Sequence, residues 1–127
     1  MRKKVTKRAK HRCEYCLLPQ SVALHKNEVD HIIPTQHGGK TEENNLALSC
    51  MRCNRYKGSN VGSFDPITGE LTQFFNPRVH KWSDHFIIEK GFIQPLTPEG
   101  RVTISIFNIN QNERVSERKR LLQSGSY

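Results

Sequence analysis

Three polar residues have the side chains that hydrolysis of a phosphodiester would require. Asp30 and His31 are neighbours in the segment Glu28–Pro34, and Asn54 directly follows the last cysteine of the chain. The imidazole of His31 titrates near neutral pH and so suits a general base that activates water. Carboxylate and amide oxygens are hard ligands, which makes Asp30 and Asn54 candidate ligands of a divalent cation. Such a cation would stabilise the charge that develops on a phosphate.

Each of these residues also has an ordinary structural explanation. An Asp-His pair is most often an exposed polar pair, Asn54 can cap a helix, and Asn45 can form a turn. Neighbours in a strand point to opposite faces. Asp30 and His31 therefore share a site only if the strand twists or ends there, or if cation and base lie on different sides of the phosphate.

The four cysteines form two pairs with the spacing of a zinc site. Cys13 and Cys16 are separated by two residues, as are Cys50 and Cys53, and 33 residues lie between the pairs. Two such pairs can supply four thiolates to one tetrahedral Zn²⁺. Full coordination leaves no open position for water, so we expect this zinc to be structural. A disulfide or redox role is the less favoured alternative.

The charge of the chain favours a polyanionic partner. The formal net charge is +8, and residues 2–12 hold seven Lys or Arg and no acid. Arg52, Arg55 and Lys57 form a second basic group. This pattern is typical of proteins that bind nucleic acid, although a solubilising surface is the alternative explanation.

The sequence also predicts where in the cell the protein is located. It has no run of 18 apolar residues, so no membrane-spanning segment is expected. No apolar stretch follows the basic N-terminus, so we expect no secretory signal and a cytoplasmic location. Thiols are reduced there, which favours metal binding over disulfides.

The elements that would position these residues can be outlined from local patterns. Residues 3–12 predict a helix that leads into the first cysteine pair, and the β-branched segment 29–33 predicts a strand that stops at Pro34. Residues 38–44 predict a loop, residues 46–48 lead back to the second cysteine pair, and residues 54–58 predict a short helix.

The chain beyond Gly58 has a different sequence pattern. Phe64 and residues 71–75 flank a turn-rich segment, which predicts a hairpin. Residues 86–93 and 102–109 are expected to be strands, and residues 112–122 a charged helix. No linker rich in Pro, Gly or Ser divides the chain, so we expect a single domain over residues 1–127.

The string from Cys13 to Gly58 resembles the HNH endonuclease family in its four-cysteine form. The residues that carry the resemblance are Cys13, Cys16, Asp30, His31, Gly38, Gly39, Asn45, Leu46, Cys50, Cys53, Asn54 and Lys57. Residues 60–127, including the stretches 75–78 and 82–86, resemble the extension that follows this motif in some bacterial members.

The resemblance implies an α+β fold. We expect a small zinc-stabilised domain with a ββα-metal active site, in which two antiparallel strands and one helix surround a divalent cation. Residues 1–59 would form the zinc-knuckle and catalytic core, and residues 60–127 an extension rich in β-hairpins. The implied activity is endonucleolytic hydrolysis of DNA, which leaves a 5′ phosphate.

The resemblance also implies roles for single residues. His31 would be the general base, Asp30 a ligand of the catalytic cation, and Asn45 would orient the loop that keeps His31 in place. Asn54 stands where many members carry the final histidine and would be the second ligand. An amide oxygen there favours Mg²⁺ or Mn²⁺ in the catalytic site.

Three further residues are candidates for substrate binding. Lys57 and Arg55 could hold phosphates near the cut, and His37 could contact the scissile phosphate. Solvent-exposed charge is the alternative for Arg55 in particular.

Two other functions compete with a nuclease. A non-catalytic zinc-stabilised module that binds nucleic acid would not need Asp30, His31 and Asn54 to converge on an open metal position. In a thiol redox protein we would expect one exposed cysteine pair with a low pKa instead of two matched pairs.

Overall fold

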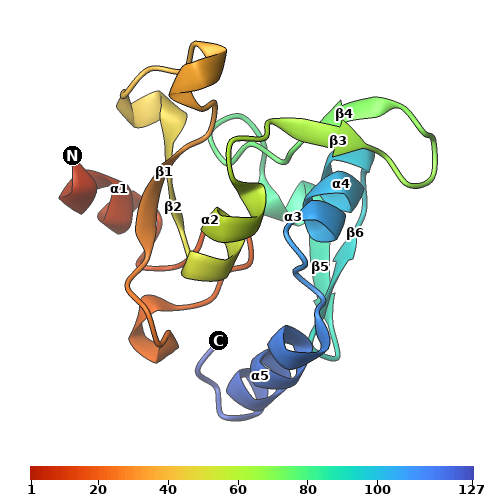
Figure 1. The fold of residues 1–127 in the computed structure, drawn as a ribbon. Helices are drawn as coiled ribbons and strands as arrows, with labels where there is room; N and C mark the ends of the chain where they lie inside the picture. Colours follow the sequence, from red (N-terminus) through yellow and green to blue (C-terminus); the bar gives the residue numbers. More distant parts are fainter.

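The structure is a computed structural model that describes residues 1–127. It is a mixture of short helices and short antiparallel strand pairs, as the α+β prediction stated (Figure 1). The helices are α1 (Arg2–Arg8), α2 (Met51–Lys57), α3 (Trp82–His85), α4 (Pro98–Ile106) and α5 (Asn112–Gln123). The strands are β1 (Glu28–His31), β2 (Leu46–Ser49), β3 (Gly62–Phe64), β4 (Leu71–Gln73), β5 (Phe86–Glu89) and β6 (Phe92–Pro95). No helix has both the length and the apolar content needed to cross a bilayer.

Three hairpins organise the chain, and each is a sheet of its own. Strand β1 pairs with β2, β3 with β4, and β5 with β6, all antiparallel. In Figure 1 the β1–β2 hairpin lies with α1 and α2 on one side of the molecule, and the other two hairpins lie with α3 and α4 on the other side. The first hairpin carries the Asp-His pair, so α1, α2 and β2 decide how that pair is positioned.

The helix at the N-terminus is shorter than predicted. It was expected over residues 3–12 but ends at Arg8, because Lys10 and His11 have positive φ angles of 56° and 57°. The N–H of His11 bonds the carbonyl of Thr6 at 3.0 Å, which closes the helix end and turns the chain into the first cysteine pair.

One predicted strand is wrong, because residues 102–109 belong mostly to helix α4. The segment is rich in β-branched residues, which favour strands. The preceding residues specify a helix start: Thr97 accepts a hydrogen bond from the N–H of Gly100 at 3.0 Å, and Pro98 occupies the first turn. Val102, Thr103, Phe107 and Ile109 are the residues that this segment buries.

Residues 86–93 were predicted to be one strand, but they form strand β5, a turn and the start of strand β6, which together make a hairpin. Lys90 and Gly91 form its two-residue turn, with φ angles of 51° and 86°. Positive φ at both positions is the geometry that suits a tight hairpin. The predictions of a hairpin around residues 65–70 and of a helix over 112–122 are confirmed by β3–β4 and α5.

The main hydrophobic core joins the two halves of the sequence. It includes Tyr15, Ile32 and Ala47 from the first half, and Phe75 and Phe107 from the second. A smaller cluster of Val5, Leu46 and Leu48 packs α1 onto the opposite side of the β1–β2 hairpin. The hairpin is therefore packed on both faces, which fixes the position of its strand ends.

Candidate functional site

The Asp-His pair lies at the C-terminal end of strand β1. Asp30 is opposite Ala47 and His31 is opposite Leu46, so the two side chains leave the hairpin on opposite faces. The strand ends at His31, which meets one of the conditions under which neighbouring residues can act on one substrate. Both residues are half-buried.

Helix α2 covers the face from which Asp30 projects. The ammonium Nζ of Lys57 lies 2.9 Å from Oδ2 of Asp30 and donates a hydrogen bond to the backbone carbonyl of His31 at 2.9 Å. The Lys57 side chain is 2% exposed. This placement does not support the expected phosphate contact of Lys57, since the lysine is enclosed and already paired.

Burial also changes the ionisation of Asp30. It raises the pKa of this carboxyl above its usual value, by more than the Lys57 ammonium and His31 lower it. Oδ2 of Asp30 is buried and receives no hydrogen bond beyond its close contact with Lys57. A buried carboxylate oxygen with so few partners gains much from an added cation.

Asn45 fastens the loop that follows His31. Its side-chain oxygen accepts a hydrogen bond from the N–H of Ile33 at 2.9 Å, and its amide donates to the carbonyls of Ile33 at 3.0 Å and Lys40 at 2.9 Å. A Cβ at Gly39 would lie 1.6 Å from the carbonyl oxygen of Ile33, so only glycine permits this close approach. The loop is thereby tied to the residues just beyond the Asp-His pair.

The imidazole of His31 has one partner in the protein. Its Nε2 lies 2.8 Å from the hydroxyl oxygen of Thr41, a residue in the same loop. Thr41 could not be predicted from the sequence, because a single threonine in a polar loop has no distinctive spacing. One ring nitrogen is thus oriented by the loop and the other remains available.

The remaining predicted site residues lie around α2. Asn54 is half-buried and precedes Lys57 by three residues, so both project from one side of the helix. Arg55 is exposed. His37 is exposed in the loop after β1, and its Nε2 lies 3.0 Å from the carbonyl of Ser59. The structure therefore brings Asp30 and Lys57 together on one face of the hairpin, with the His31 ring on the other, and Asn54 lies about one helical turn before Lys57.

The donor set of this group fits a divalent cation. Asp30 offers a carboxylate whose buried Oδ2 contacts only the Lys57 ammonium, and Asn54 offers a neutral amide oxygen. Both are ligands that Mg²⁺ and Mn²⁺ accept.

The four cysteines converge at the other end of α2. Their sulfurs all lie within 4.8 Å of one another, all four are buried and free, and Sγ of Cys16 is 3.7 Å from Sγ of Cys50. A disulfide needs about 2.05 Å, whereas a tetrahedral Zn²⁺ with Zn–S bonds of about 2.3 Å separates its sulfurs by about 3.8 Å. The cluster is therefore consistent with a structural zinc.

The first cysteine pair is also attached directly to β2. Glu14 donates its N–H to the carbonyl of Leu48 at 2.8 Å, and its carboxylate accepts the N–H of Leu48 at 2.8 Å. The same carboxylate forms an ion pair with Arg78. These bonds fix the zinc cluster relative to the hairpin that carries Asp30.

Comparisons with known proteins agree with this geometry. Residues 13–60 match the model of the HNH endonuclease family. The Septu protein PtuB of Bacillus thuringiensis is 27% identical over 106 residues, which is 82% of this chain and 38% of that relative. The chain thus spans 38% of the length of this relative. No solved structure gives a significant match. The segment of residues 13–60, which carries the four-cysteine cluster and the Asp-His strand end, is thus similar to the HNH endonuclease family.

Proposed function

We propose that this protein is a metal-dependent endonuclease that hydrolyses phosphodiester bonds in DNA. The placement of Asp30 and His31 at the end of β1, on opposite faces of the hairpin, carries the proposal. In an in-line displacement, water attacks phosphorus from the side opposite the leaving oxygen. A base on one face and a cation ligand on the other suit that geometry.

His31 acts as the general base in this proposal. When Nε2–H donates to the Thr41 hydroxyl, 2.8 Å away, Nδ1 carries the lone pair and can accept a proton from the attacking water. The bonds of Asn45 to Ile33 and Lys40 keep the loop in place and so support the position of the ring.

Asp30 and Asn54 would hold Mg²⁺ or Mn²⁺. When bound, the divalent cation supplies stabilisation for the charge on the phosphate and on the leaving 3′ oxygen. A cation bound there would compete with Lys57 for the carboxylate of Asp30. Lys57 continues to anchor the strand end through the carbonyl of His31.

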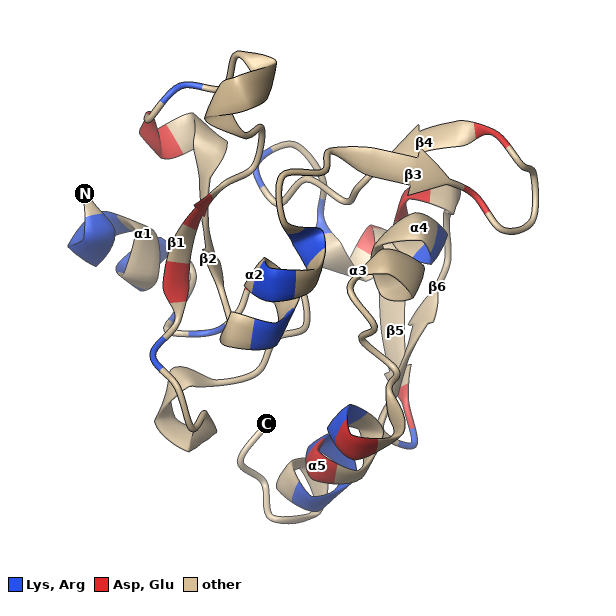
Figure 2. Cartoon of the chain, viewed as in Figure 1, with Lys and Arg blue, Asp and Glu red and all other residues tan.

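Basic side chains outside this group would bind the DNA backbone. Figure 2 shows Lys and Arg along α1 and α2, the two helices next to the β1–β2 hairpin. Arg55, Lys3, Lys7 and Lys10 are exposed and free to contact phosphates. Their proximity to the hairpin would align the scissile phosphate with the strand end.

The ion pair between Lys57 and Asp30 favours a second candidate function. A carboxylate that permanently pairs with lysine, at 2.9 Å, would not recruit a cation, and the protein would then be a zinc-stabilised module that binds nucleic acid without cutting it.

One assay separates the two functions. Supercoiled plasmid is incubated with the protein in Mg²⁺, in Mn²⁺ and in EDTA, with His31→Ala protein purified in parallel as a control for contaminating nucleases. We expect nicked or linear DNA with a divalent cation and none with EDTA or with the control. Binding without conversion of the plasmid under every condition would support the non-catalytic module.

A further inference from the structure

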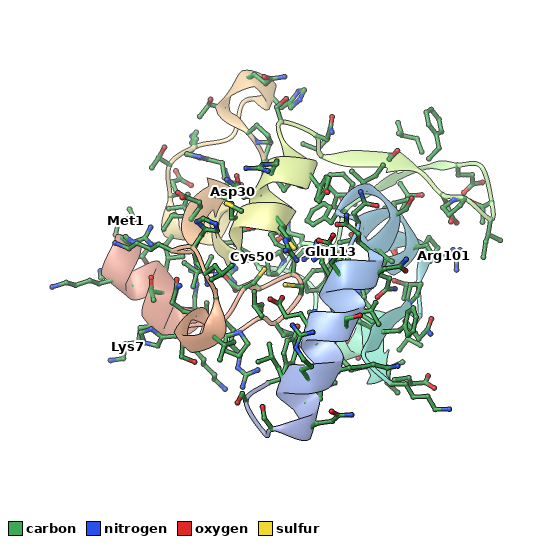
Figure 3. All side chains as sticks on the ribbon, turned by 60° about the horizontal axis from the view of Figure 1, so that its bottom comes forward. Met1, Lys7, Asp30, Cys50, Arg101 and Glu113 are labelled. Carbon is green, nitrogen blue, oxygen red and sulfur yellow. The ribbon has the colours of Figure 1, made fainter.

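The C-terminal helix begins against the zinc cluster. Nη2 of Arg114, in the first turn of α5, lies 3.1 Å from Sγ of Cys53 and 3.9 Å from Sγ of Cys50. Nη1 of the same guanidinium donates to the carbonyl of Phe107 at 2.8 Å. Figure 3 shows Cys50 beside the start of α5, where Glu113 is labelled. A residue 61 positions after Cys53 thus contacts the metal ligands.

The hydrogen bonds to the cysteine sulfurs show what the contact of Arg114 with Cys53 adds. The N–H of Cys16 donates to Sγ of Cys13, and the N–H of Cys53 donates to Sγ of Cys50, both at 3.5 Å. Sγ of Cys53 receives no backbone N–H, and its donor is the guanidinium of Arg114. Arg114 therefore supplies from a distant helix the bond that the second cysteine pair does not supply itself.

Arg114 has no carboxylate partner, although it is only 4% exposed. The ion pairs of the protein join Lys4 to Glu43, Lys57 to Asp30, Arg78 to Glu14 and Arg101 to Asp65. Burying an unpaired cation is costly, so a counter-charge is needed nearby. Four thiolates and one Zn²⁺ carry a net charge of −2, which provides it.

A second buried guanidinium lies on the same side of the cluster. Arg118 is 3% exposed, donates to the carbonyls of Gly91 and Ile109, and also forms no ion pair. Arg114, Arg118, Cys16 and Cys50 line one cavity of about 100 Å³ between the cluster and α5. The two buried guanidinium groups of α5 thus lie beside a centre whose expected charge is equal and opposite to theirs.

We propose that Arg114 is the counter-ion and hydrogen-bond donor of the zinc–thiolate centre, so that zinc binding and the docking of helix α5 are coupled. The guanidinium stabilises negative charge on Cys53 and Cys50, and the centre in turn compensates a buried charge on α5. This coupling is reciprocal, because whatever docking adds to zinc affinity, zinc adds to docking. The inference concerns the structural metal and does not depend on DNA cleavage.

The first test measures zinc retention in the full chain. Purified wild type, Arg114→Met and Arg120→Met are challenged with a chromophoric chelator, and zinc transfer is followed by absorbance. Outer partners of metal ligands typically contribute ten- to hundredfold to affinity, so we expect Arg114→Met to lose zinc affinity by about that factor. Arg120→Met, an exposed arginine of the same helix, should behave as wild type.

Equal zinc retention in Arg114→Met and wild type would overturn the proposal. If Arg114→Met does not fold, Arg114→Lys carries the same test. A lysine keeps the charge but lacks the planar fork that reaches a sulfur and the carbonyl of Phe107 together. Several-fold weaker zinc retention is expected for it, and unchanged retention would again overturn the idea.

The second test examines the helix. Amide hydrogen exchange of residues 112–123 is compared in the zinc-loaded protein and after zinc is removed by the chelator. We expect α5 to lose protection earlier, at lower chelator concentration, than the β5–β6 hairpin. Protection of α5 that is unchanged after zinc has left would show that docking is independent of the metal.

Discussion

The ammonium of Lys57 and the carboxylate of Asp30 form a buried ion pair, 2.9 Å apart, that joins helix α2 to strand β1. The same ammonium bonds the backbone of His31. A single side chain therefore contacts both members of the Asp-His pair, which links the stability of the strand end to the occupancy of the proposed cation site.

Replacing Lys57 by methionine should destabilise the protein. It leaves the buried carboxylate of Asp30 unpaired, and removal of one partner of a buried pair costs about 3–5 kcal/mol. A cation at Asp30 should offset part of that loss, so Mn²⁺ should raise the unfolding free energy of Lys57→Met by more than that of wild type. Urea unfolding in EDTA and in Mn²⁺ measures both effects. Arg55→Met, on the same helix but exposed, should change stability by less than about 0.5 kcal/mol.

Replacing His31 by alanine should remove catalysis and keep the fold. The ring contacts only the Thr41 hydroxyl through a hydrogen bond, so its loss leaves no buried charge or unpaired backbone group. Loss of a general base lowers the rate by about 10²- to 10⁴-fold. Plasmid cleavage rates, circular dichroism and DNA affinity are compared with wild type. Cleavage at the wild-type rate would show that another group is the base.

Asn54→Ala should behave as the loss of a metal ligand. Cleavage in Mg²⁺ should fall, and excess Mn²⁺ should restore part of it, whereas extra metal should not rescue His31→Ala. Asn54 suits this test better than Asp30, because its side chain makes no hydrogen bond in the protein, whereas Asp30→Ala would leave Lys57 buried and unpaired. Identical metal dependence of Asn54→Ala and wild type would contradict the ligand assignment.

Only part of the basic N-terminal segment is available to DNA. Arg8 donates to the carbonyls of Glu43 at 2.8 Å and Leu46 at 2.7 Å, so it attaches α1 to the hairpin. The exposed lysines Lys3, Lys7 and Lys10 make no such bonds.

The triple change Lys3→Gln, Lys7→Gln and Lys10→Gln should therefore weaken DNA binding uniformly across sequences. If all three contact phosphates, the slope of log affinity against log salt should become shallower by about 2–3 units. Binding isotherms at several salt concentrations measure the slope. Arg8→Gln, in contrast, should chiefly lower thermal stability. An unchanged slope in the triple variant would place the DNA elsewhere.

Asp65 should contribute to stability in a pH-dependent way. The Arg101 guanidinium, at 2.7 and 2.8 Å, holds the pKa of this carboxyl well below its usual range, and burial opposes that shift. The folded state thus binds this proton less tightly than an unfolded chain does, in which an aspartate titrates near about 4. The contribution is fully present above that pH and is lost as the pH falls below it.

Urea unfolding between pH 6 and pH 3 tests this prediction. The stability difference between wild type and Asp65→Asn should shrink as the solution becomes more acidic. Asp84→Asn serves as the control, because Asp84 is exposed and forms no ion pair. A difference that stays constant over this range would show that Asp65 titrates normally.

The sequence predicted the cysteine cluster, because the fixed spacing of the two pairs encodes it. The cysteine pairs had to converge if they bind one metal, and they do so within 4.8 Å. The strand at Asp30 and the hairpin around residues 65–70 followed from β-branched residues and turn residues.

Contacts that depend on three-dimensional packing could not be predicted in this way. The burial of Lys57 depends on how α2 packs on β1. The contact of Arg114 with Cys53 joins residues that are 61 positions apart. The error at residues 102–109 had a different origin. Thr97 and Pro98, which precede this segment, specify a helix start, so its β-branched residues do not decide its structure alone.

The bonds between Glu14 and Leu48 have a consequence for the order of folding events. The two cysteine pairs enclose 33 residues, and bringing the ends of such a loop together costs about 3 kcal/mol of chain entropy. The β1–β2 hairpin and the two hydrogen bonds of Glu14 already bring those ends together. A zinc ion that arrives after the hairpin has formed meets a nearly closed ring of ligands. A zinc ion that binds before the hairpin has formed must itself close the loop of 33 residues, so the hairpin lowers the entropic cost of zinc binding.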